Sequence, residues 1–149
     1  KIGEKITLRR ASFFEKKNGV NFSYVHSAIE KDIGKIIAVV KLNDSEGSKQ
    51  IGTKLAMHIA ASSPLAIDKT GLNKSVIDKE LEIIKAELLN SGKKPEMIEK
   101  ISQGKLNKFV SDNTLLNQAW IMDPKMKVSD IVKENKIIDF VRYKVGEGV

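Results

Sequence analysis

The feature that most constrains the fold is the order of the hydrophobic periodicities along the chain. Apolar residues alternate with polar residues near the start, recur at helical spacing through the middle, and form a last extended run at 137–144. Strand patterns at both ends with helices between them indicate that the last strand returns to the first sheet. The sequence therefore predicts an α+β fold, with an antiparallel sheet and packed helices.

Three extended segments are expected before the first helix. The alternation of Ile6 and Leu8 with polar residues, continued by two phenylalanines, predicts a strand over about 5–14. The segments 20–24 and 36–42 show the same strand character. Short connections, including the turn signal at 17–19, favour an antiparallel meander of these three segments.

Helical periodicity accounts for most of the remaining chain. One helix carries Ile51, Leu55 and Ile59 and ends before Pro64, and a second covers 75–89. A third helix is expected from Pro95 through the apolar positions up to 109, and a brief one near 128–132. Because the helices after about residue 91 precede the returning strand, they are expected to project as an insertion.

Composition limits the classes of function. The 149 residues include 26 Lys and Arg against 19 Asp and Glu, a net charge of +7, and no cysteine. The absence of cysteine excludes disulfides, thiolate metal sites and cysteine nucleophiles. The basic balance favours an acidic partner, which could be nucleic acid, protein or membrane surface, or it serves only solubility. No apolar run approaches the roughly 18 residues of a membrane helix, so no membrane span is expected.

Motifs that carry chemistry are missing from the sequence. The two histidines, His26 and His58, lack a partner at metal-binding spacing, and neither a phosphate-binding loop nor a G-x-S-x-G motif occurs. The carboxylates Glu80 and Glu87 fit a solvated helix face. We therefore expect no catalytic residue, no metal, no cofactor and no direct nucleotide binding, and the chain is not expected to be an enzyme.

His58 leaves two interpretations open. At about 100° per residue it lies roughly 20° from Ile51 on the helical wheel. A ridge of small residues, Gly52, Ala56 and Ala60, runs beside it and suits close packing. His58 is thus expected at the edge of a packing face. It is either a satisfied core histidine or a contact for another protein.

Six fragments of the chain resemble bacterial elongation factor Ts in the order and spacing of that family. The fragment around His58, A-M-H-I-A-A-S-S-P at 56–64, is similar to the family signature. The others are I-G-E-K-I-T-L-R-R at 2–10, S-G-K-K-P-E-M-I-E-K-I at 91–101, G-K-L-N-K-F at 104–109, L-L-N-Q-A-W-I-M-D-P at 115–124 and F-V-R-Y-K-V-G-E-G at 140–148.

The resemblance implies a cytoplasmic factor that exchanges guanine nucleotide on elongation factor Tu. It implies a core subdomain of residues 1–90 and 140–149 with a three-stranded antiparallel sheet, and a helical dimerisation subdomain of residues 91–139 that allows self-association. The family's T-D-F-V motif lies upstream of the segment matching 2–10 and is not in this chain. The sequence is therefore interpreted as a C-terminal portion with reduced exchange activity.

The resemblance also implies the partner-binding residues. His58 would contact the nucleotide-binding domain of elongation factor Tu, while Ile33, Gly34 and Val110 would face its third domain. If His58 is such a contact at a boundary, its replacement by alanine should cost little stability, within about 1 kcal/mol.

Two other functions are considered. An RNA-binding module of the translation apparatus would explain the charge of +7, but aromatic residues make up only 5% of the chain and no RNA-recognition-motif signature occurs. A homodimeric scaffold would rest on the expected helical insertion and could coexist with nucleotide exchange.

Overall fold

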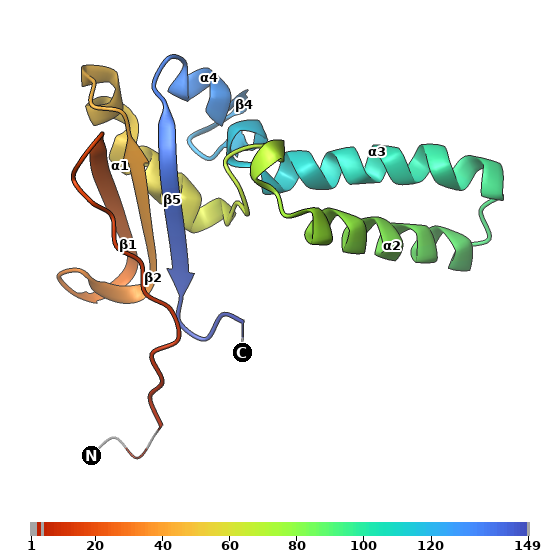
Figure 1. Ribbon diagram of the computed structural model, residues 1–149, viewed down its shortest axis with the longest axis horizontal. Coiled ribbons are helices and arrows are strands. Elements are labelled where there is room, and N and C mark those ends of the chain that lie inside the picture. The colour runs from red at the N-terminus through yellow and green to blue at the C-terminus, as the bar shows by residue number, and fades with distance from the viewer. Residues whose placement is uncertain (1–2, 4, 149) are drawn as a thin grey trace.

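The sheet of the protein has three antiparallel strands in the order β1–β2–β5 (Figure 1). The computed structural model describes residue 3 and residues 5–148; Ile2 and Glu4 of the first motif lie outside them. The strands are β1 (Val20–Glu30), β2 (Ile33–Leu42) and β5 (Ile137–Lys144). The sequence-based expectation that the last strand rejoins the first sheet is confirmed, and so is the α+β class.

Alternation along the strands gives the sheet a buried face and a half-open face. Ala38, Val40 and Leu42 of β2 are fully buried, whereas the intervening residues are only half-buried. The buried face is covered by helix α1 (Glu46–Ser62). This packing forms the main hydrophobic core, which also takes in residues from the C-terminal third of the chain: Leu115, Trp120, Val128, Val132 and Ile137.

The strand predicted over 5–14 is wrong. Residues 5–15 form no ladder, and Ile6, Leu8 and Phe13 are 79%, 86% and 85% exposed. The segment crosses the half-open face of the sheet (Figure 1). There the Arg10 guanidinium lies over the Tyr143 ring, 5.0 Å from its centroid. Period-two alternation indicates an extended backbone, but pairing also needs a free strand edge beside it. Because the segment crosses the face of the sheet, it lies along neither edge strand; the third strand is β5, and the predicted N-terminal meander does not form.

Helix α1 begins and ends at defined caps. The Ser45 side chain accepts a hydrogen bond from the Ser48 backbone N–H at 3.0 Å, which satisfies a donor of the first turn. The helix ends at Ser63, which adopts the left-handed conformation with φ 50° directly before Pro64. This sharp stop fixes the direction in which the chain leaves the helix.

The predicted ridge of small residues on α1 does pack closely on the sheet. Gly52 and Ala56 are buried, and a Cβ built on Gly52 would overlap the ring of Phe22 in β1. We expect Gly52→Ala to destabilise the protein by about 1–3 kcal/mol, because this overlap outweighs the higher helix propensity of alanine.

Gly104 of helix α3 (Pro95–Asn113) provides a matched control for Gly52. A Cβ at Gly104 would meet nothing within 4 Å. Gly104→Ala is therefore expected to stabilise the protein by up to about 1 kcal/mol. Urea denaturation of both variants checks the pair, and a stabilised Gly52→Ala protein would contradict the close packing.

Two long helices form a hairpin that projects from the sheet and its covering helix (Figure 1). The hairpin consists of α2 (Lys74–Asn90) and α3, and it has its own core of Ile84, Leu88, Ile98 and Leu106. Its base contacts the rest of the protein through a small cluster of Ala66, Leu72 and Val110. The projecting unit thus includes a helix on each side of residue 91. That residues 91–139 act as a dimerisation subdomain stays a prediction.

The chain returns from the hairpin to the sheet through short elements. These are the 3₁₀ turn η2 (Leu115–Asn117), the two-stranded hairpin β3 (Ala119–Trp120) and β4 (Asp123–Lys127), and α4 (Val128–Val132); another 3₁₀ turn, η1 (Lys69–Gly71), precedes α2. They pack against α1, so Trp120 is only 4% exposed. This return path places residues 118–122 beside the C-terminal half of α1.

Candidate functional site

His58 lies fully inside the protein and not at the edge of a packing face, where the helical pattern predicted it. The residue is 0% exposed, and its ring stacks on Trp120 with centroids 5.2 Å apart and an interplanar angle of 20°. Its Nε2 lies 3.0 Å from Gln118 Oε1, and its Nδ1 accepts a hydrogen bond from the Ile121 N–H at 3.4 Å. The β3 segment covers this face of α1, and the wheel of an isolated helix cannot show such a cover.

The bonding partners determine the tautomer of His58. Nδ1 accepts from a backbone N–H, so the proton of the neutral ring lies on Nε2 and is donated to Gln118 Oε1. Burial lowers the pKa of His58, and the hydrogen bond to Gln118 opposes this effect only partly. His58 is therefore a neutral structural imidazole that joins α1 to the β3 segment.

The lowered pKa gives a pH dependence of stability that can be assigned to His58. The unfolded chain takes up the proton first, near its ordinary pKa of about 6.5, so the contribution of His58 is complete above that pH and is lost as the pH falls below it. We expect the unfolding free energy to decrease more steeply between about pH 7.5 and about pH 5.5 than in His58→Gln. Urea denaturation at both pH values checks this; equal slopes would contradict a neutral buried ring.

A groove of 500 Å³ opens on the surface next to buried His58. Ile121 and Met122, at the β3–β4 turn, are 40% and 46% exposed, and Met57 is half-buried on α1. Two cationic side chains, Arg142 and Lys144, line the same groove. The remaining lining residues are Tyr24, His26, Ile36, Ala60, Ala61, Ser63 and Ile121. The groove combines an apolar floor with a basic rim, which suits a protein partner with an apolar anchor.

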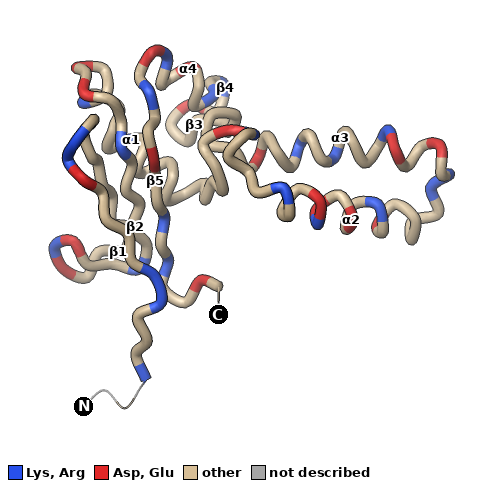
Figure 2. The backbone as a smooth tube through the Cα atoms, viewed as in Figure 1, with Lys and Arg blue, Asp and Glu red and all other residues tan. Residues whose placement is uncertain are grey.

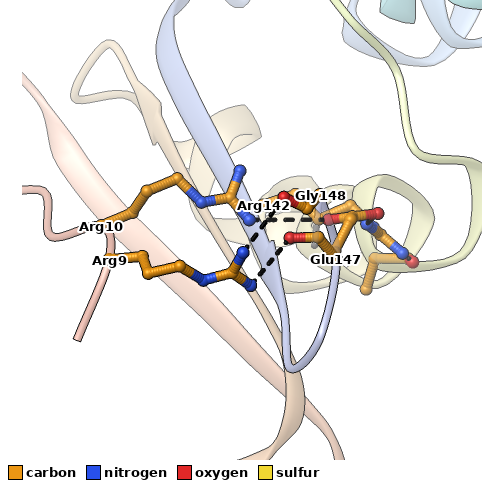
Figure 3. Close-up of polar contacts among 6 residues, drawn as sticks. Arg9, Arg10, Arg142, Glu147 and Gly148 are labelled. Carbon is orange, nitrogen blue, oxygen red and sulfur yellow. Dashed lines mark hydrogen bonds and ion pairs between the residues drawn. The ribbon is translucent and has the colours of Figure 1, made fainter. Parts of the chain in front are cut away.

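Arg142 is held in place at this rim by two elements. Its Nε donates to the Ala60 carbonyl at 3.0 Å, and its Nη1 donates to Glu147 Oε1 at 2.8 Å. Arg9 in turn donates to the backbone carbonyls of Glu147 and Gly148 at 3.1 and 3.0 Å (Figure 3). The C-terminal tail, the N-terminal segment and the end of α1 are thus tied together beside the groove.

A larger groove of 840 Å³ lies between β5 and residues 63–71, and it shares Arg142 with the smaller groove. Arg142 binds Glu147, and the Asp68 carboxylate accepts hydrogen bonds from the N–H and hydroxyl of Thr70. The smaller groove beside His58 is the better candidate, because Met57, Ala60 and Ala61 of the segment around His58 line it together with exposed Ile121.

Of the predicted site residues, Ile33 and Gly34 lie together at the tip of the β1–β2 hairpin. Ile33 is 56% exposed. Gly34 faces backbone, since a Cβ there would lie 2.9 Å from the His26 carbonyl oxygen and 2.5 Å from Val25 Cγ1. The absence of a side chain at Gly34 is thus required by close strand packing near the register shift between Ala28 and Glu30.

Val110 and His58 are both inside the protein, and the structure does not gather the four predicted residues into one site. Val110 is 9% exposed and packs in the cluster at the base of the hairpin. His58 lies near the C-terminal end of α1, whereas Ile33 and Gly34 lie at the tip of the β1–β2 hairpin. Only Ile33 presents a large apolar side chain to solvent.

The sequence reasoning missed Gln118, Ile121 and Arg142. All three lie inside fragments that resemble the family, so the motif matches at 115–124 and 140–148 contain the only signal for them. Their role depends on contacts with α1, about 60 residues away in the case of Gln118 and His58.

Charge does not single out a nucleic-acid surface. In the part of the chain that the structure describes, Lys and Arg occur on most elements and are interleaved with Asp and Glu (Figure 2). A stripe of cations, the usual footprint of a nucleic-acid site, is not formed by this arrangement. Among these residues, no cluster of three or more His, Asp or Glu is placed to hold a metal ion. None of the helices in the described ranges has the length and apolarity required to cross a bilayer.

Comparison with known proteins gives one consistent result. The family described as elongation factor TS matches residues 1–147. Elongation factor Ts of Nitrobacter hamburgensis is 38% identical, over 99% of this chain and 52% of that protein. The proteins of the same name from Clostridium acetobutylicum and Rickettsia prowazekii are 37% and 35% identical, over 100% and 99% of this chain and 51% and 52% of theirs. The chain therefore spans about half the length of the curated relatives that it matches.

Proposed function

The chain belongs to the elongation factor Ts family, and from that membership we propose that it binds elongation factor Tu and promotes the release of guanine nucleotide. Such a factor makes and breaks no covalent bond. If it binds the nucleotide-free partner better than the nucleotide-bound partner, it weakens nucleotide binding by the same factor. Surface shape and a few apolar anchors are sufficient for this action.

The observation that supports the proposal most is the groove beside His58. It brings exposed Ile121 next to Met57 of the A-M-H-I-A-A-S-S-P segment, and it is also lined by Lys144 and by Arg142, which is paired with Glu147. Large flexible apolar side chains are typical anchors of protein interfaces. We assign the contact with the nucleotide-binding domain of elongation factor Tu to this groove.

The predicted contact residues take different roles in this proposal. His58 supports the groove from inside, because its ring holds the Ile121 backbone and packs on Trp120. Ile33, exposed at the tip of the β1–β2 hairpin, meets the third domain of elongation factor Tu. Gly34 permits the close strand packing at that tip, and Val110 fixes the base of the helical hairpin.

Binding and nucleotide release test the proposal separately. Calorimetry with nucleotide-free elongation factor Tu should detect weak binding of the chain. Stopped-flow release of a fluorescent GDP analogue should show less acceleration than full-length elongation factor Ts gives, since the T-D-F-V motif of the family is not in this chain. No binding at high micromolar concentration would refute the proposed partner, whereas full acceleration would refute only the expected weakness.

Self-association through the helical hairpin is a second proposal, supported by apolar side chains on its surface. Leu89 and Met97 are 60% and 51% exposed near its tip, and Ile83 is 45% exposed. A two-helix unit with a single small core leaves such side chains free for a further helix to cover. Sedimentation at rising protein concentration should reveal dimers that Leu89→Asp weakens; a monomer at all concentrations would contradict this proposal.

A further inference from the structure

The C-terminal end of α3 in the helical hairpin lies near the C-terminal end of α1, because Gln118 bonds to both. The backbone carbonyls at these two helix ends need hydrogen-bond donors. The last four carbonyls of any α-helix have no partner within the helix. In α1, the Ala60 carbonyl accepts from Arg142, and the Ser62 carbonyl accepts from Gln118. In α3, the Asn113 carbonyl accepts from the Leu65 N–H, and the Asp112 carbonyl likewise accepts from Gln118.

The side chain of Gln118 serves both helices at once. Its Nε2 donates to the Ser62 carbonyl of α1 at 3.2 Å and to the Asp112 carbonyl of α3 at 2.8 Å. Among the hydrogen bonds of the described residues, this is the only side chain that bonds the backbone of both helices. Because the amide nitrogen faces two carbonyls, the amide oxygen must face the third neighbour, His58 Nε2, at 3.0 Å.

Gln118 is itself fixed from the main chain. It is only 7% exposed, and its carbonyl accepts a hydrogen bond from the Val128 N–H at 3.0 Å. All donors and acceptors of its amide group therefore have partners in a buried setting, where a fully satisfied network is rigid and a partly satisfied one is costly.

We propose that Gln118 is a positioning residue, which holds the α2–α3 hairpin in a fixed orientation to the His58 end of α1 and thereby couples the hairpin to the groove. The proposal deepens the proposed function and rests on it for the part that concerns the partner. The chain of contacts runs from Asp112 through Gln118 and His58 to the backbone of Ile121, which lines the groove. A partner or a second copy bound to the hairpin would influence the groove by this route.

The absence of cysteine allows the orientation to be measured directly. Spin labels are attached to Lys54→Cys on the exposed side of α1 and to Lys93→Cys at the tip of the hairpin. The unsubstituted background should give a single narrow distance distribution. Gln118→Met fills the same space without hydrogen bonds, and we expect it to lose the narrow peak. Gln103→Met, on the exposed side of α3, is the matched control and should keep it.

A second variant separates the two functions of the amide. Gln118→Glu, measured at alkaline pH, keeps an oxygen that accepts from His58 but has no N–H for the helix ends. It should keep the Nε2-protonated imidazole signal of His58 in nitrogen NMR and still lose the narrow distance peak; Gln118→Met should lose both. If either folded variant keeps the distance distribution of the unsubstituted chain, the proposal is overturned. Gln118→Glu also decides the matter if Gln118→Met does not fold.

The functional consequence is measured with elongation factor Tu. Gln118→Met should reduce affinity for the nucleotide-free partner by about 3- to 30-fold, the range of couplings carried by contact networks, while Gln103→Met leaves it unchanged. Unchanged affinity in Gln118→Met would overturn the coupling to the groove. If the unsubstituted chain does not bind this partner at all, the proposed function fails, and the distance and NMR measurements still decide the role of Gln118.

Discussion

Replacing His58 by alanine is expected to lower the unfolding free energy by about 2–4 kcal/mol. The ring is fully buried and stacked on Trp120, so its removal leaves a cavity in the main core. The change also leaves the Gln118 side-chain oxygen and the Ile121 N–H without a hydrogen-bond partner inside the protein. Both effects act in the same direction.

Thermal and urea denaturation of His58→Ala measure this effect. His26→Ala is the control, because that histidine lies on the exposed half of β1, and its loss should cost less than about 0.5 kcal/mol. A cost below about 1 kcal/mol for His58→Ala would show instead that the ring is at a boundary, as the helical pattern alone had predicted.

The helical pattern placed His58 at a boundary, whereas the structure buries it. This difference shows what helical periodicity can and cannot predict. The wheel of α1 correctly identified the buried Leu55 and Ile59 and the ridge that packs on Phe22. It could not show that β3, with Trp120, covers the neighbouring stripe, because that contact joins residues about 60 positions apart. The burial of His58 is thus a tertiary property.

The strands illustrate the same limit. The patterns at 20–24 and 36–42 predicted β1 and β2, and the order of elements predicted that β5 returns to them. The alternation of Ile6 and Leu8 is equally regular, yet this segment forms no ladder. Alternation indicates an extended backbone, whereas pairing requires that the segment lie along a strand edge, and this segment crosses the face of the sheet instead.

The candidate site was only partly accessible from the sequence. The family resemblance directed attention to the segment around His58, and the groove lies there. The residues that shape the groove, Ile121 and Arg142, come from the far end of the chain, and their approach to α1 depends on the return path after the hairpin. Residue types and spacings carry no information about that path beyond the motif match itself.

Ile121→Ala is expected to weaken binding to nucleotide-free elongation factor Tu by about tenfold or more, which is the effect of removing an interface anchor. The side chain is 40% exposed at the groove, so its truncation should cost less than about 1 kcal/mol of stability. Alanine keeps the backbone N–H that His58 Nδ1 accepts, so the supporting contact inside the protein is preserved. The variant therefore removes an apolar surface and little else.

Ile138→Ala is the matched control for Ile121→Ala, because Ile138 is the same residue type with 38% exposure but lies in β5 outside the groove lining. Calorimetry should show a loss of affinity for Ile121→Ala alone.

Met57→Ala provides a second test from α1, in the lining of the same groove. If both groove side chains contact one anchor of the partner, the double variant should lose less affinity than the two single losses together, because residues that share a contact are not additive. Equal affinities of Ile121→Ala and Ile138→Ala would place the binding surface elsewhere, with the tip of the β1–β2 hairpin at Ile33 as the next surface to test.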